Sequence, residues 1–136
     1  RAWPQVQTSG FRSLAHQREK TCFDRLRNSW VSAEVLHRIG GHTHGMQCVR
    51  VWTKRGWVVL ASDTSHYYEH FEKRRAYTTM FNVGEALQGY AKLEALAQSN
   101  NHIIPGHDPL VMQRYPAPSS SMAGVVVRLD VEPQNG

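Results

Sequence analysis

Three residues that can bind a metal stand where an apolar stretch of the sequence meets a loop. His42 lies in the Gly- and His-rich residues 40–47, directly before an apolar run, Asp63 ends a second apolar run, and His107 follows a third. Zinc takes imidazole and carboxylate ligands, and a catalytic zinc keeps one position open for water. Binding lowers the pKa of that water to about 7, which supplies hydroxide at neutral pH. Because a carboxylate has two oxygens, Asp63 could also bridge two ions. These three residues predict half of a metal site.

Spacing alone leaves a simpler interpretation open. The chain has eight histidines, so it offers many combinations of two histidines and one aspartate. His42 and His107 would then be polar loop residues that bond to the backbone. His44 lies two positions after His42 and would share its side of an extended segment, which makes it a second candidate ligand.

Length and composition indicate one globular domain. The chain has 136 residues, of which 40% are hydrophobic, and this suits a modest core. No apolar run approaches the roughly 18 residues of a transmembrane helix, and no signal peptide is recognisable. The two cysteines, Cys22 and Cys48, do not make a disulfide framework, and Cys48 is expected to be a small buried hydrophobe. We therefore expect a cytoplasmic protein with no membrane partner. Since the sequence begins at Arg1 and not at Met, we also expect a start that is missing or processed.

The distribution of charge argues against nucleic-acid binding. The net charge is +5, but residues 1–30 carry six basic and two acidic residues, whereas the remaining chain carries ten basic and nine acidic residues. The densest basic cluster of the later part, residues 73–75, has no aromatic residues between its charges. A basic cluster of this kind is usually a solvated surface. We expect no nucleic-acid partner.

Strands are expected to position the candidate ligands. A partial alternation over residues 31–39 predicts one strand. Residues 48–53 alternate again, residues 54–56 form a short turn that ends in glycine, and residues 57–61 are a continuous apolar run typical of a strand buried on both faces. The last three segments predict a hairpin.

Helical spacing appears twice in the second half of the chain. Residues 64–72 are expected to hold a helical turn, and residues 83–98 to form an amphipathic helix capped by Asn82. The apolar stripe of the second helix is predicted at Val83, Leu87, Tyr90, Leu93 and Leu96.

The remaining segments are expected to be a short strand, a loop, a strand and a tail. The short strand is predicted over residues 102–104, the surface loop over 112–121, the last strand over 125–129 and the tail over 131–136. Residues 1–30 match no clear pattern. We therefore expect an unmatched basic segment over residues 1–30 and a domain over residues 31–130.

Three stretches of the sequence resemble the C-terminal half of a metallo-β-lactamase-fold hydrolase. They are Gly-His-Thr-His-Gly-Met-Gln at residues 41–47, Gly-Trp-Val-Val-Leu-Ala-Ser-Asp at 56–63 and Ile-Pro-Gly-His-Asp-Pro-Leu-Val-Met at 104–112. The Pro-Gly-His-Asp-Pro sequence is most similar to the N-acyl homoserine lactonase branch. The resemblance, which runs from about Val35 to Leu129, implies an α/β (α+β) fold that is part of an αββα sandwich, mostly its C-terminal half.

The resemblance also implies an activity. His42 and His107 would each bind one of two zinc ions, with other divalent metals as alternatives, and Asp63 would bridge both. Metal-bound hydroxide would attack the carbonyl of a small-molecule lactone and open its ring, a quorum-quenching reaction. Asp108 would orient His107 as a hydrogen-bond acceptor, with a role in the turn as the alternative.

Two departures from the family pattern bear on this expectation. The family's first metal motif, His-x-His-x-Asp-His, is absent from the 136 residues. We therefore expect a truncated chain with weak metal binding and little or no activity. A family tyrosine three positions after the bridging aspartate is replaced by His66, with Tyr67 beside it, so both are candidate catalytic residues together with Asp63. The alternatives are another lactone or ester hydrolase of the superfamily and a non-catalytic degenerate fragment.

Overall fold

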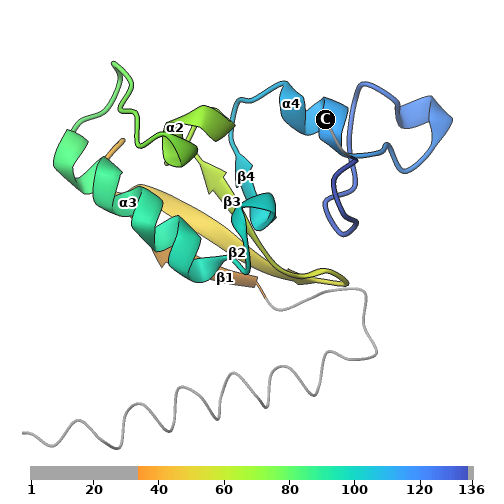
Figure 1. Ribbon diagram of the computed structural model, residues 1–136, viewed down its shortest axis with the longest axis horizontal. Coiled ribbons are helices and arrows are strands. Elements are labelled where there is room, and N and C mark those ends of the chain that lie inside the picture. The colour runs from red at the N-terminus through yellow and green to blue at the C-terminus, as the bar shows by residue number, and fades with distance from the viewer. Residues whose placement is uncertain (1–33, 135–136) are drawn as a thin grey trace, which may run out of the picture. The chain divides into compact units, whose positions relative to one another are not determined.

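A four-stranded sheet forms the centre of the computed structural model, which describes residues 34–134. In sheet order the strands are β1 (Glu34–Arg38), β2 (Gln47–Thr53), β3 (Gly56–Ser62) and β4 (Ile103–Pro105). The first three pair antiparallel, and β4 pairs parallel with β3. The expectations for residues 1–30, and for the start of the first strand, lie outside the described residues. The sheet and its helices give the α+β class predicted from the sequence (Figure 1).

The predicted hairpin is confirmed. β2 and β3 are joined by a turn at Lys54 and Arg55, and the last pair of the ladder joins Thr53 to Gly56. Gly56 has a φ of +101°, a conformation that glycine adopts without steric cost. The Thr53 hydroxyl donates to the Gly56 carbonyl at 2.8 Å, which closes the turn.

The predicted long helix is also confirmed, as α3 (Val83–Leu96). The Asn82 side chain accepts a hydrogen bond from the Glu85 amide at 3.0 Å and so caps the helix start. The predicted apolar stripe is wrong at two of its positions, because Val83 and Leu87 are 47% and 37% exposed.

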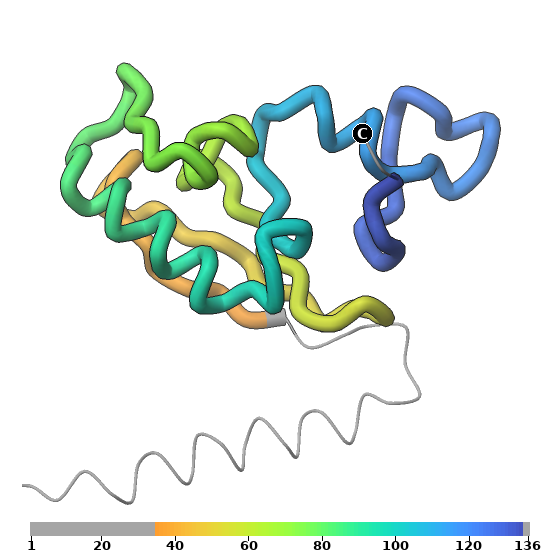
Figure 2. The backbone as a smooth tube through the Cα atoms, viewed as in Figure 1, coloured from red at the N-terminus to blue at the C-terminus, as the bar shows by residue number. Residues whose placement is uncertain are grey.

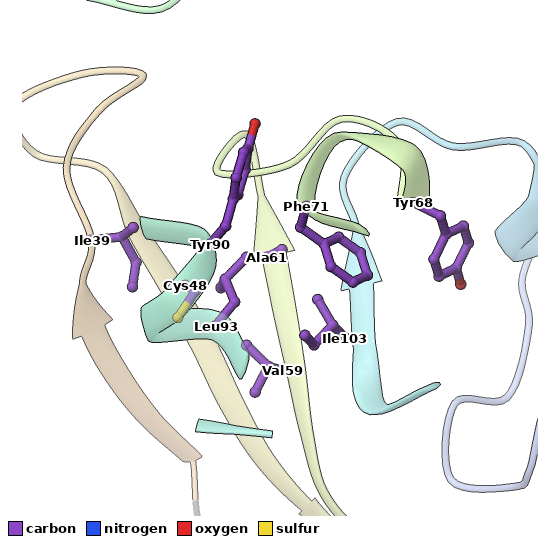
Figure 3. Packing of buried hydrophobic residues seen from close by; sticks show 9 residues of the cluster. All are labelled: Ile39, Cys48, Val59, Ala61, Tyr68, Phe71, Tyr90, Leu93 and Ile103. Carbon is purple, nitrogen blue, oxygen red and sulfur yellow. The ribbon is translucent and has the colours of Figure 1, made fainter. Parts of the chain in front are cut away.

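Small residues explain which face of α3 packs on the sheet. Ala86 and Gly89 are buried, and a Cβ added at Gly89 would lie 2.7 Å from the Cγ2 of Ile39. The helix backbone therefore approaches the sheet closely on this side, and Tyr90 and Leu93 of the same face enter the core. Figure 3 shows these two side chains over β2 and β3, with Phe71 beside them. The whole cluster is Ile39, Cys48, Val59, Ala61, Tyr68, Phe71, Tyr90, Leu93 and Ile103.

Cys48 is buried in this core, as predicted. Its side chain is fully inaccessible to solvent, and burial raises the pKa of the thiol from 9.0 to about 11. Within residues 34–134, no helix has the length and apolar character needed to span a membrane.

The other face of the sheet has an aliphatic row that crosses all four strands. The strand register places one row of paired residues across it, Leu36, Val49, Leu60 and Ile104. The C-terminal segment covers one end of this face, since Tyr115, Val127 and Leu129 join the cluster of Val58 and Ile104. Leu36, at the other end, is 66% exposed. One sheet with helices on one face and an aliphatic second face fits part of a sandwich.

The C-terminal segment differs from the sequence prediction. Residues 125–129, predicted as a strand, form no strand, and the predicted loop at 112–121 overlaps two short helices. These are α4 (Leu110–Arg114) and η2 (Ser120–Met122). Valine-rich residues favour strands only where a neighbouring strand can pair with them. Here the Arg128 amide bonds to the Pro116 carbonyl at 2.9 Å, and Val127 and Leu129 pack on the sheet face.

Arg55 ties the end of the described chain to the hairpin turn. Its side chain is only 3% exposed. The guanidinium donates to the carbonyls of Val131 and Asn101 and to the Tyr115 hydroxyl, and it pairs with Glu132 at 3.3 Å. Residues 131–132 are therefore held against the hairpin by a buried cation.

Candidate metal centre

Strand direction brings three loops to one edge of the sheet. β3 and β4 run parallel, and β1 runs the same way as β3 because both are antiparallel to β2. The carboxyl ends of these three strands therefore lie at the same edge, where ligands bind in open α/β sheets. His42 follows β1, Asp63 follows β3, and His107 follows β4. In Figure 1, β3 and β4 both point toward α2 (Tyr68–Glu72). This helix confirms the helical turn predicted within residues 64–72.

The contact between β3 and β4 continues into their loops. The Gly106 amide donates to the Ser65 carbonyl at 2.9 Å, and the His107 amide donates to the His66 carbonyl at 3.0 Å. Gly106 permits this approach, since a Cβ there would lie 2.7 Å from the Ser62 carbonyl oxygen. The imidazoles of His66 and His107 consequently lie with their centroids 4.5 Å apart.

Asp63, His66 and His107 form a compact group of metal-binding atoms. One ligand atom from each lies within 4.8 Å of the other two. Asp63 Oδ1 is 2.5 Å from His107 Nε2 and 3.5 Å from His66 Nε2. The side chains of Asp63, His66 and His107 are 35%, 22% and 56% exposed, respectively, so solvent reaches the group. Two imidazole nitrogens and a carboxylate oxygen are donors that suit zinc.

Burial favours the metal-binding form of His66. Desolvation, and next the neighbouring His107, hold the pKa of His66 below its ordinary value, although Asp63 opposes this shift. A histidine binds metal through an unprotonated nitrogen, so a lower pKa extends the pH range in which His66 can act as a ligand.

The predicted ligand His42 lies beside this group rather than within it. Its ring centroid is 5.8 Å from that of His66, and its Nδ1 is 3.3 Å from the Tyr77 hydroxyl. His44 is exposed, and its ring contacts Phe81 with a centroid distance of 4.3 Å. The structure thus brings Asp63 and His107 together, adds His66 to them, and leaves His42 at the margin.

The other two candidate residues lie around the group. Tyr67 is 42% exposed, and its ring centroid is 6.4 Å from that of His66. The Asp108 carboxylate accepts from the amides of Tyr68 and Leu110, both at 2.9 Å. These bonds hold the first residues of α2 and α4. Among the hydrogen bonds of residues 34–134, none joins Asp108 to His107.

Tyr77 belongs to the site although no sequence pattern pointed to it. Its hydroxyl donates to the Asp63 carbonyl, and its ring stacks on His66 with a centroid distance of 3.9 Å and an interplanar angle of 29°. The ring also stacks on His70, at 5.0 Å and 19°. Burial raises the pKa of Tyr77 well above its ordinary value, so the hydroxyl keeps its proton. Tyr77 lies in the loop between α2 and α3, and its role depends on how that loop folds back.

No protein-family model matches this sequence, and a search of curated proteins finds no match. Solved structures do match. One is an N-acyl homoserine lactone hydrolase with the product N-hexanoyl-L-homoserine bound at the catalytic metal center, and another is a mutant of B. thuringiensis AiiA with N-decanoyl-L-homoserine bound at the active site. Each shares 28% identity with this chain at a TM-score of 0.53, and the match covers 62% of this chain.

The chain spans about a third of the length of these structures, 34% in both cases. The similarity agrees with the resemblance and the fold class predicted from the sequence. The described residues form part of a metallo-β-lactamase-type sandwich, and the chain is similar to the N-acyl homoserine lactonases of that fold.

Proposed function

We propose that this chain is the C-terminal part of a metal-dependent hydrolase of the N-acyl homoserine lactonase type. The observation that supports the proposal is the group of Asp63, His66 and His107 at the carboxyl edge of the sheet. It occurs in a chain whose structural neighbours hold N-acyl-L-homoserine at a metal center or active site. The proposed domain covers residues 31–130.

Asp63, His66 and His107 would hold zinc, with His42 as a further ligand beside them. When bound, the metal would supply a Lewis acid and a water that is nucleophilic at neutral pH. Asp63 Oδ1 lies 3.5 Å from His66 Nε2 and 2.5 Å from His107 Nε2, so these three atoms would converge on one ion. His107, the most exposed of the three at 56%, would be the ligand most accessible to a small-molecule lactone.

The 136-residue chain would bind zinc weakly and turn over lactone slowly. It contains no His-x-His-x-Asp-His motif. Within the described residues, the metal-binding group therefore consists of Asp63, His66 and His107. Lactone turnover by the isolated chain near the roughly 10 per second typical of enzymes would contradict this part of the proposal.

Product binding tests the proposed function without requiring full catalysis. The purified chain, with and without zinc, would be titrated with N-hexanoyl-L-homoserine and, separately, with hexanoate. We expect zinc-dependent binding of the homoserine product that is lost in Asp63→Ala and kept in His44→Ala. Equal binding of hexanoate would favour another ester or lactone hydrolase of the superfamily. No zinc-dependent binding of either compound would contradict the proposal and favour a non-catalytic fragment.

A further inference from the structure

Tyr77 occupies the junction of the loops that carry the metal centre. Its own loop is hydrogen-bonded to the loop after β1: the Phe81 amide donates to the His42 carbonyl at 3.3 Å, and the Asn82 amide donates to the Gly41 carbonyl at 2.9 Å. Figure 2 shows these two segments side by side near the start of α3. Gly41 is needed for this contact, because a Cβ there would lie 2.6 Å from the Ala86 backbone. Backbone contacts therefore tie the loop that carries Tyr77 to the loop that carries His42.

The hydroxyl of Tyr77 determines which nitrogen of His42 carries the proton. A tyrosine hydroxyl has one proton to donate and lone pairs with which to accept. The Asp63 carbonyl can only accept, so the proton of Tyr77 goes to that carbonyl. The hydroxyl oxygen is then an acceptor for His42 Nδ1, 3.3 Å away. A neutral His42 consequently carries its proton on Nδ1, and its Nε2 carries a free lone pair.

We propose that Tyr77 is a positioning residue of the metal centre, and this inference builds on the proposed function. Its hydroxyl holds His42 in the tautomer whose Nε2 can bind a metal, and its ring holds the plane of His66. Metal-binding histidines usually donate their second ring N–H to a fixed acceptor, and loss of that acceptor weakens metal binding. Tyr77 supplies such an acceptor to one imidazole and a stacking surface to the other.

The first test measures the tautomer of His42 in metal-free protein. Nitrogen-15 NMR of the histidine rings distinguishes protonated from unprotonated ring nitrogens, at about pH 8, where an ordinary imidazole is neutral. We expect wild-type His42 to be protonated on Nδ1 and Tyr77→Phe to lose this preference. Protonation on Nε2 in the wild type, or an unchanged tautomer in Tyr77→Phe, would overturn the proposal. Since the experiment contains no metal, it does not depend on the proposed function.

The second test measures zinc affinity by competition with a chromophoric chelator. Tyr77→Phe keeps the ring and removes the hydroxyl. We expect it to weaken zinc binding by about 10-fold, the lower end of the effect of removing the hydrogen-bond partner of a metal ligand. Tyr115→Phe is the matched control, because it removes a hydroxyl that donates to the Asn101 carbonyl at 3.0 Å, outside the metal group. Unchanged affinity in Tyr77→Phe, or an equal loss in Tyr115→Phe, would overturn the proposal. If the wild type binds no zinc, the proposed function fails, and the tautomer still tests Tyr77.

Discussion

Replacing Gly106 with alanine tests how the metal centre is built. The new Cβ would lie 2.7 Å from the carbonyl oxygen of Ser62 and 2.8 Å from its carbonyl carbon. Ordinary contact begins at 3.4 Å, so the end of β3 and the loop after β4 must separate by about 0.7 Å. Gly106 is not among the glycines with positive φ, so the cost arises from this contact and not from backbone strain.

The expected cost is that of inserting a methyl group where no space exists, about 1–3 kcal/mol. For a folding unit of this size, each kcal/mol lowers the melting temperature by about 4–8 °C, so a loss between about 4 and 24 °C is expected. The separation also stretches the bonds from Gly106 to Ser65 and from His107 to His66, now 2.9 and 3.0 Å. His66 and His107 move apart, and zinc binding weakens with stability.

Thermal unfolding followed by circular dichroism, together with zinc competition, measures both effects. Gly45→Ala is the matched control, because an added Cβ at Gly45 has no atom within 4 Å and its φ is not positive. We expect the control to stay within about 0.5 kcal/mol of the wild type. If Gly106→Ala has the same melting temperature and zinc affinity as Gly45→Ala, the close approach of the two loops does not position the site.

Three further predictions concern the scaffold. Arg55→Ala should lower the free energy of unfolding by about 1–3 kcal/mol in a denaturant titration, because it removes the guanidinium hydrogen bonds to the Val131 carbonyl and the Tyr115 hydroxyl, each worth about 0.5–1.5 kcal/mol; wild-type stability would contradict this. Asn82→Ala should cost about 1 kcal/mol in the same assay, whereas Asn82→Asp should restore most of it. In a Cys22→Ser background, the Cys48 thiol should resist a thiol reagent at pH 9.0 until denaturant is added, because burial raises its pKa to about 11. Rapid labelling of the folded protein would refute this. Because the pKa of the Cys48 thiol is higher in the folded than in the unfolded chain, the stability that the buried neutral thiol contributes is complete below pH 9.0 and declines as pH rises toward 11.

The positions of Asp63 and His107 could be predicted because both follow strands with clear apolar patterns. Strand direction places them at the same edge of the sheet. The hairpin and the Asn82 cap were predictable for a similar reason, since each depends on a few neighbouring residues.

Features that depend on distant contacts could not be predicted in this way. Tyr77 reaches the site because its loop bonds to the loop of His42, and no local pattern encodes that contact. The buried face of α3 carries the small residues Ala86 and Gly89 beside Tyr90 and Leu93, whereas Val83 and Leu87 of the predicted stripe are exposed. Residues 125–129 have strand-like composition, but within residues 34–134 they pair with no strand.

The central claim is that Asp63, His66 and His107 bind one metal ion together. Its most direct test is zinc titration of the purified chain against a competing chelator, with Asp63→Ala, His66→Ala and His107→Ala as variants and His44→Ala as the control. We predict measurable zinc binding by the wild type and His44→Ala, and an affinity at least about 10-fold lower in each of the three variants. Wild-type affinity in any of the three, or no zinc binding by the wild type, would contradict the claim.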